Sequence, residues 1–166
     1  PNSTSSGSDF KLLLLNKAIP QSYSPYFNGW DKSGNISNSG VTIHHPEGDI
    51  KMISTYSTSL IPTRYYGSES NTAGYYWKVQ WAKTENGHGV TEGGSSGSPL
   101  FNSNGLIIGA LTGGEASCEK SSSPDYYGRF SISWHPQGSD STGQLDYWLN
   151  PSNSKIPDVL SGYDPY

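Results

Sequence analysis

Residues 93–105 read GGSSGSPLFNSNG, and this stretch decides what kind of fold the chain forms. Glycine and serine alone would suit a flexible linker. The residues from Pro99 onward argue against a linker, because apolar residues lead into an Asn104-Gly105 turn and a second apolar run follows at 106–111. Two apolar runs around an Asn-Gly pair predict a β-hairpin. A glycine-rich bend joined to such a hairpin belongs to a folded core, where it can hold a serine hydroxyl in place.

The composition indicates one weakly charged domain. The 166 residues suffice for a sizeable core; 32% are apolar and only 14% are charged. Twelve tyrosines and five tryptophans bury much area at low cost in side-chain entropy, which suits all-β secreted proteins. The net charge of −4 offers no basic patch, so we expect no nucleic-acid partner. No apolar run approaches the roughly 20 residues of a membrane helix, so we expect no membrane partner.

Short strand patterns separated by turn signals predict an all-β sandwich or barrel with a C-terminal helix. Residues 143–149 alone have helical character, and Asn150-Pro151 ends them. Residues 1–8 and 20–40 are predicted to be loop, with Trp30 as an anchor. We find no repeat and no linker, so 1–166 is expected to be one domain. The predicted strands are 9–15 (DFKLLLL, a buried strand), 41–43, 50–53, 75–81, the two arms of the hairpin at 99–111, and 128–134.

The hexapeptide Gly94-Ser95-Ser96-Gly97-Ser98-Pro99 resembles the nucleophile loop of chymotrypsin-like serine proteases. This resemblance implies that Ser96 is the nucleophile and that the N–H groups of Gly94 and Ser96 stabilise the oxyanion. Asp9, at the start of an apolar run upstream of Ser96, resembles the triad aspartate. The implied fold is an antiparallel chymotrypsin-like β-barrel, comprising the second barrel and the last part of the first.

A narrower resemblance is to the bacterial lysyl endopeptidases, and it runs from Asp9 almost to the C-terminus. It implies that Asp125 lies at the floor of the specificity pocket, where its carboxylate would pair with a substrate lysine. It also implies that Thr112, Gly113 and Gly114 pair with the substrate backbone. The motifs that carry this likeness are Ile-His-His-Pro at 43–46, VTEGGSSGSP at 90–99, Gly-Gly at 113–114 with Cys118, DYYGR at 125–129 and LDYWLNP at 145–151.

Two points about Asp125 stay open at this level. Ser-Pro-Asp is also a turn sequence, so this carboxylate could simply accept hydrogen bonds in a turn. The preference for lysine over arginine follows only from the resemblance, because one aspartate can hold either cation.

A histidine in the expected place is missing. In this family it precedes the aspartate, and none of the eight residues before Asp9 is a histidine. The four histidines are at 44, 45, 88 and 135. Asp9, His45 and Ser96 would match the order of subtilisins, but the helix start that carries a subtilisin serine is absent, so we do not assign His44 or His45 to catalysis.

Another alternative takes Gly93-Gly94-Ser95-Ser96-Gly97 as the nucleophile elbow of an α/β-hydrolase, with Ser95 as nucleophile. Such an elbow leads from a strand into a helix, whereas here Pro99 and a hairpin follow. The sequence context therefore excludes this reading.

The sequence is best explained as the C-terminal portion of a two-barrel secreted endopeptidase that acts on polypeptides with a basic residue before the scissile bond. The chain begins at Pro1 without a methionine, so we expect it to be cut from something longer. The N-terminal portion would supply the histidine and, in an oxidising compartment, a disulfide partner for Cys118. We expect no cofactor and no metal. The alternative is an inactive pseudoprotease or a peptide-binding module.

Overall fold

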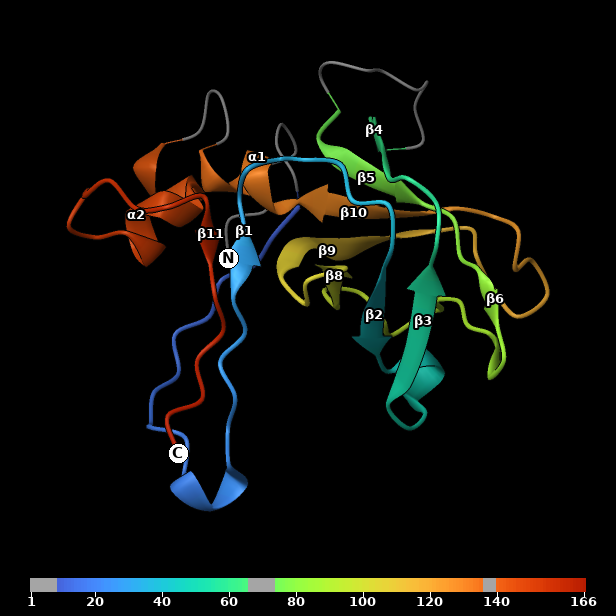
Figure 1. Cartoon of the computed structure of the whole chain (residues 1–166), viewed down its shortest axis with the longest axis horizontal. Helices are drawn as coiled ribbons and strands as arrows, with labels where there is room; N and C mark the ends of the chain where they lie inside the picture. The colour runs from blue at the N-terminus through green and yellow to red at the C-terminus, as the bar shows by residue number, and fades with distance from the viewer. Residues whose placement is uncertain (1–8, 66–73, 136–139) are drawn as a thin grey trace.

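The computed structural model describes residues 9–65, 74–135 and 140–166, and within them it is mostly antiparallel β-sheet (Figure 1). The predicted all-β class is confirmed. The strands are β1 (Trp30–Asp31), β2 (Gly40–His44), β3 (Met52–Tyr56), β4 (Ile61–Thr63), β5 (Tyr76–Val79), β6 (Lys83–Thr84), β7 (Gly87–His88), β8 (Pro99–Asn102), β9 (Ile107–Gly114), β10 (Asp125–Arg129) and β11 (Val159–Leu160). The helices are α1 (Phe130–Trp134) and α2 (Leu145–Leu149), with 3-10 turns η1 (Gln21–Tyr23), η2 (Pro46–Gly48) and η3 (Ser141–Gly143).

The main sheet has the strand order β3-β2-β8-β9-β10-β5-β4. β3 and β4 stand at its two ends and do not pair with each other, so within the described ranges the sheet is not closed as a barrel. β1 runs parallel to β9 and antiparallel to β11, and β6 and β7 form a separate hairpin. Figure 1 shows α1, α2 and the β1–β11 pair together at one end of the sheet.

The hairpin predicted from the Asn-Gly turn is confirmed. β8 and β9 pair antiparallel, with Leu100 opposite Gly109. Gly105 has a φ of +72°, a conformation that glycine adopts without steric cost. The Asn102 side chain closes the turn, because its Oδ1 accepts the N–H groups of Asn104 (3.0 Å) and Leu106 (3.1 Å).

Two large aromatic side chains at the centre of the core form hydrogen bonds through their polar atoms. Trp77 is 1% exposed and donates its Nε1–H to the Ile108 carbonyl at 3.1 Å. Tyr56 is fully buried and donates its hydroxyl to the Phe101 carbonyl at 3.1 Å. These two rings thus contribute buried area without leaving their polar atoms unpaired. The core cluster comprises Tyr56, Leu60, Trp77, Val79, Trp81, Val90, Leu100, Ile108, Leu111, Ala116 and Tyr127.

The strand predicted at 9–15 is wrong. The segment forms no strand, and Leu13, Leu14 and Leu15 are 70%, 97% and 63% exposed. A strand needs a neighbouring strand to accept its backbone hydrogen bonds, and none of the described strands lies beside this segment. Figure 1 shows it extending away from the sheet next to the C-terminal stretch.

The strand predicted at 128–134 is also wrong beyond its first residues, because β10 ends at Arg129 and α1 begins at Phe130. Helical spacing brings Phe130 and Trp134 together, with ring centroids 6.0 Å apart. Both rings pack on Trp30, at 5.9 and 5.4 Å. The alternating apolar residues that predicted a strand therefore lie in a short helix, α1, which packs on Trp30.

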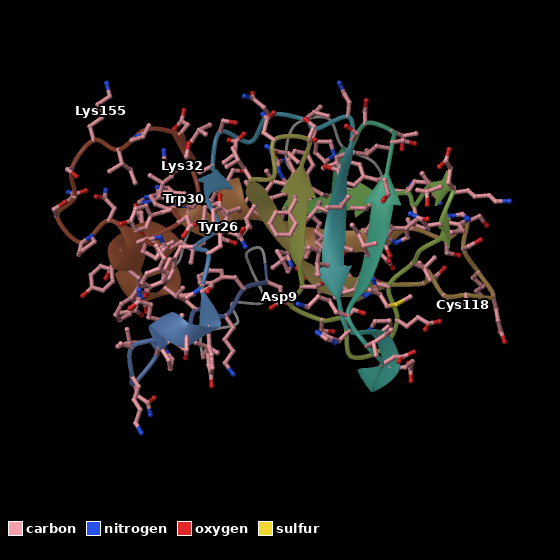
Figure 2. The ribbon with its side chains drawn as sticks, turned by 60° about the horizontal axis from the view of Figure 1, so that its bottom comes forward. Asp9, Tyr26, Trp30, Lys32, Cys118 and Lys155 are labelled. Carbon is pink, nitrogen blue, oxygen red and sulfur yellow. The ribbon has the colours of Figure 1, made fainter. Side chains whose placement is uncertain are left out.

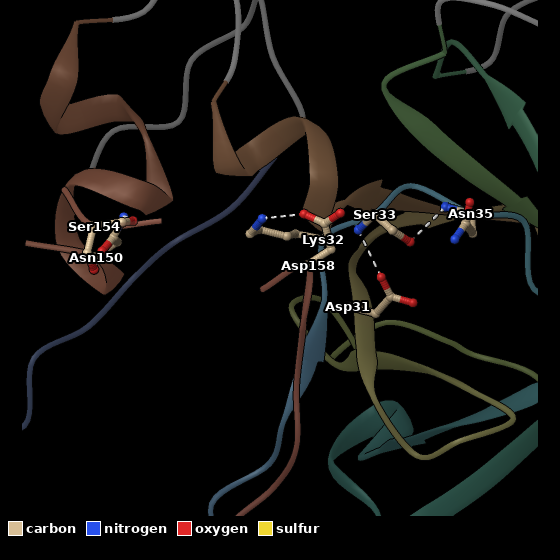
Figure 3. Close-up of polar contacts among 7 residues, drawn as sticks. All are labelled: Asp31, Lys32, Ser33, Asn35, Asn150, Ser154 and Asp158. Carbon is tan, nitrogen blue, oxygen red and sulfur yellow. Dashed lines mark hydrogen bonds and ion pairs between the residues drawn. The ribbon is translucent and has the colours of Figure 1, made fainter. Parts of the chain in front are cut away.

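The remaining predicted elements are close to the observed ones. The strand expected at 50–53 begins only at Met52, whereas the predicted helix is present as α2 and ends before Asn150. Trp30 is 9% exposed and is an anchor as predicted. An ion pair beside it joins Lys32 Nζ to Asp158 Oδ1 at 2.6 Å, which ties β1 to the chain entering β11 (Figure 3). No helix among the described residues is long and apolar enough to span a bilayer.

Replacing Leu100 with alanine tests the core. Leu100 is fully buried, so Leu100→Ala is expected to lower the free energy of unfolding by about 2–5 kcal/mol through lost transfer energy and a cavity. Leu14→Ala, at a 97% exposed position, is the matched control and should change it by less than about 0.5 kcal/mol. Urea unfolding of the chain measures both, and equal losses would contradict this description of the core.

Candidate active site

The serine loop turns one serine inward and the next one outward. Gly94 and Gly97 have φ values of +90° and +82°, which favour glycine. Between them Ser95 is 2% exposed, whereas Ser96 is exposed to solvent. Burial of Ser95 also removes the α/β-hydrolase alternative, because a nucleophile must reach its substrate.

Backbone hydrogen bonds hold this loop on both sides. The Glu47 N–H donates to the Gly93 carbonyl at 2.6 Å, next to η2. On the other side the Gly97 N–H donates to the Leu111 carbonyl (2.7 Å), and the Leu111 N–H donates to the Ser98 carbonyl (2.9 Å). The N–H groups of Gly94 and Ser96, which were predicted to bind the oxyanion, donate to no backbone carbonyl within the described part of the chain.

A pocket of about 520 Å³ brings three predicted site residues together, since Asp9, Ser96 and Thr112 all line it. The side chains of Phe10, Leu111, Phe130, Leu145 and Leu149 form much of its wall, as is usual for a ligand site with a few polar groups. Burial raises the pKa of Tyr76, and the charge of Asp9 raises it further, whereas hydrogen bonds with Thr112 and Asp9 oppose the rise. Figure 2 shows Asp9 near the middle of the molecule, below the strands.

No histidine lines this pocket among the described residues. His45 is exposed and lies 3.1 Å from the Asp49 carbonyl, and His88 lies 3.2 Å from the Trp81 carbonyl. His135 pairs with Asp146 at 3.0 Å in a different pocket. His44 is buried, contacts the inward Ser95 of the serine loop and does not line this pocket. The pocket is therefore lined by an aspartate and a serine but by no histidine of the described chain.

Asp125 is buried without a cation. It is 1% exposed, and its Oδ2 accepts the Trp81 Nε1–H and the Thr91 hydroxyl, each at 2.6 Å. Its Oδ1 accepts the Ala116 N–H at 3.3 Å. Burial raises the pKa of this carboxyl, and the three neutral donors only partly oppose that rise. Asp125 does not line the pocket of Ser96, so the structure separates this predicted specificity residue from the two predicted catalytic residues.

The segment Thr112, Gly113 and Gly114 connects the two regions. It is the end of β9, where Gly113 and Gly114 pair with Tyr126 and Asp125 of β10. A Cβ on Gly114 would collide with Asp125 Oδ1 and also with the Asp125 Cα (2.5 Å) and the Pro124 carbonyl oxygen (2.6 Å), so the close approach of β10 requires glycine here. β8 pairs with β9 only as far as Ala110, and no described strand covers the second edge of 112–114.

The sequence did not reveal the partners of Asp125. Thr91 lies within the motif that precedes the serine loop, so it could have been considered. Trp81 lies far away in the sequence and follows a strand whose aromatic pattern indicates only a core position. Within the described ranges, no group of three His, Cys, Asp or Glu side chains forms a metal site.

Cys118 is exposed and has no disulfide partner in the described chain. Its backbone N–H donates to Glu92 Oε1 at 3.1 Å. A hydrogen bond with Glu92 raises the pKa of the thiol, so its reactive thiolate is disfavoured. In Figure 2 it lies at the opposite end of the molecule from Lys155.

Thr91→Val tests the environment of Asp125, because it removes a donor that favours the ionised form. The Asp125 pKa should rise further, as followed by carboxyl NMR titration. Stability at pH 7 should fall by about 1.5–3 kcal/mol. The pKa of Asp125 in the folded state is raised above the unfolded value near 3.8, so below pH 3.8 the carboxyl is protonated in both states. The loss of stability caused by Thr91→Val should therefore be small there and should grow as pH rises through the folded-state pKa. Thr55→Val in β3 is the control; a pH-independent penalty at Thr91 would contradict this prediction.

Comparison with known proteins gives one family and one solved structure. The family model described as lysyl endopeptidase, C-terminal domain, matches residues 2–128. A crystal structure of the inactive form of a serine-to-alanine mutant of Rv3671c from M. tuberculosis H37Rv has 14% sequence identity and a TM-score of 0.38. That match covers 75% of this chain and 52% of the other, so this chain spans about half the length of that protein. Because the family model covers most of the chain, the protein belongs to the lysyl endopeptidase C-terminal domain family.

Proposed function

We propose that the chain is the C-terminal part of a secreted serine endopeptidase that hydrolyses peptide bonds after lysine. The observation that carries this proposal is the shared pocket of Asp9 and Ser96, two residues far apart in the sequence. Ser96 is exposed in a loop held by backbone bonds on both sides, which is what a nucleophile needs. Membership of the lysyl endopeptidase family supports the same reaction.

In the proposed mechanism, Ser96 Oγ attacks the carbonyl carbon before the scissile bond and gives its proton to a histidine. The Gly94 and Ser96 N–H groups stabilise the oxyanion that forms. The C–N bond then breaks as the histidine returns the proton to the leaving amine, and water hydrolyses the acyl-enzyme by the same route. Asp9 orients the histidine. The N-terminal part of the same protease supplies that histidine.

The preference for a basic residue rests on the unpaired charge of Asp125. Its three partners are neutral, so a substrate ammonium would be the first cation to reach it. A charge-assisted pair in such a dry site is short and strong. The open edge at Thr112, Gly113 and Gly114 suits an extended substrate, which adds as a strand.

The N-terminal part also has a surface to cover. Leu13, Leu14 and Leu15 expose a run of apolar side chains next to the pocket residues Phe10 and Leu12. Exposed apolar runs of this kind mark interfaces. The expected disulfide through Cys118 and the extracellular location remain parts of this proposal; Cys118 is exposed and therefore accessible to a partner.

A pseudoprotease or peptide-binding module is the second candidate, and the absence of a histidine from the pocket of the described chain favours it. The two candidates differ in one observation. The complete protein hydrolyses a lysyl ester if it is a protease, and binds lysyl peptides without turnover if it is not.

Ser96→Ala in the complete enzyme tests the proposed nucleophile. It should lower kcat for a lysyl ester by about 10⁶, because losing a triad nucleophile has an effect of that size. Ser103→Ala, in the exposed hairpin turn, is the matched control and should leave kcat unchanged. Thermal unfolding checks that both variants are folded, and a Ser96→Ala rate within tenfold of wild type would refute the assignment.

Asp125→Asn tests the specificity. It keeps the shape of the side chain but leaves a bound ammonium without its counter-charge, which costs roughly 3–5 kcal/mol, or a factor of about 10²–10³ in kcat/KM for lysyl substrates. An alanyl substrate is the internal control and should be cleaved at nearly its original slow rate. If kcat/KM falls equally for both substrates, Asp125 has a structural role. If kcat/KM falls for neither, the proposed specificity for basic residues is wrong.

A further inference from the structure

His44 is a buried histidine that contacts the serine loop from behind. It is the last residue of β2 and is 3% exposed. Its Nδ1 lies 2.8 Å from the Ser95 hydroxyl, and its Nε2 lies 3.0 Å from the Ser54 hydroxyl. Both hydroxyls are buried as well. All hydrogen bonds of this group must therefore be made inside the protein.

The neighbours decide which ring nitrogen carries the proton. The Ser54 hydroxyl donates its only proton to the Val90 carbonyl at 2.9 Å, so towards His44 it acts as an acceptor. Nε2 must then be the protonated nitrogen, and Nδ1 keeps its lone pair. The Ser95 hydroxyl donates to Nδ1 and in turn accepts the Glu92 N–H at 3.4 Å.

These bonds form one directed chain from the Glu92 N–H through Ser95, His44 and Ser54 to the Val90 carbonyl. Its two ends lie on the short segment that leads into Ser96. Thr91, which bonds Asp125, lies between those ends. Hydrogen bonds thus connect one buried imidazole to the serine loop and to the segment that contains Thr91, the hydrogen-bond partner of Asp125.

We propose that His44, as the neutral Nε2–H tautomer, is the positioning residue of the serine loop: it fixes the inward Ser95 and thereby orients Ser96 and the oxyanion donors of the loop. This inference rests on the proposed function of Ser96. His44 takes no part in the proton transfers of the reaction, because its ring is buried and does not line the pocket of Ser96.

A second proton on His44 would disrupt this chain. An Nδ1–H would face the Ser95 hydroxyl, which would lose its acceptor. Burial lowers the His44 pKa and so does the neighbouring His45, whereas the charges of Asp125 and Glu92 raise it. The net effect is a pKa below 6.5, so the stability that depends on neutral His44 is fully present above pH 6.5 and is lost as pH falls through the folded pKa.

Two conservative variants of the complete enzyme separate positioning from packing. In His44→Asn the side-chain oxygen can take the place of Nδ1 and accept from Ser95; in His44→Gln the amide can take the place of Nε2 and donate to Ser54. Both lose one buried hydrogen bond and should lose similar stability. If His44 orients the loop through Ser95, kcat for a lysyl ester should fall about 10²-fold in His44→Gln, as a misplaced catalytic group does, and much less in His44→Asn, with KM changed little in either.

His45→Asn is the matched control on the exposed neighbour and should leave kcat unchanged. Equal kcat values for His44→Asn and His44→Gln, or a His44→Gln value within twofold of wild type, would overturn the proposal. NMR of the ¹⁵N-histidine-labelled complete enzyme gives a readout without catalysis, with the His44 signals assigned from their loss in His44→Asn.

At pH 8 the His44 signals should be those of a neutral ring protonated at Nε2, and an Nδ1–H or charged ring would overturn the proposal. Failure of the wild-type enzyme to hydrolyse lysyl esters would instead refute the proposed function. The tautomer of His44 is tested by the NMR result alone.

Discussion

The buried carboxylate of Asp125 joins three separate segments of the chain. It begins β10, and its oxygens accept hydrogen bonds from Trp81 after β5, Thr91 before the serine loop and Ala116 after β9. Removing a carboxylate from water is costly unless donors replace the water, so all three segments must converge on it. The carboxylate and the adjoining backbone of Pro124 and Asp125 together exclude a side chain at Gly114. The packing of this part of the sheet and the proposed specificity of the site thus depend on one charge.

A second buried set of bonds acts from the opposite side of the serine loop. His44 and Ser54, on the paired strands β2 and β3, hold Ser95 and the Val90 carbonyl. The loop is therefore held between β2 and β9, and its exposed serine faces the pocket that contains Asp9. Strands supply rigid positions for these contacts, and the glycines at 94 and 97 supply the backbone freedom for a tight path.

Several open features of the molecule agree with the proposed N-terminal part. The leucines that follow Asp9 are exposed, and the sheet ends in β3 and β4, each of which pairs with a strand on one edge only within the described ranges. The pocket contains an aspartate and a serine but no histidine of the described chain. Each feature leaves surface or chemistry incomplete, and one N-terminal part would complete them together.

The sequence by itself determined the features that depend on neighbours in the chain. The Asn104-Gly105 hairpin, the end of α2 before Asn150 and the left-handed glycines of the serine loop all follow from backbone preferences of a few adjacent residues. The resemblance of the serine loop and Asp9 to those of a protease could likewise be recognised from the sequence, since these motifs are short and occur in a fixed order along the chain.

Tertiary structure alone decided the rest. Phe130 and Trp134 alternate like strand residues, but docking on Trp30 made them a helix, and the leucines of 12–15 formed no strand because none of the described strands accepts their hydrogen bonds. The partners of Asp125 and His44 come from distant segments, and their donor and acceptor roles exist only once the fold removes water from around them. Local patterns encode backbone preference, whereas burial and polar pairing depend on which segments meet in space.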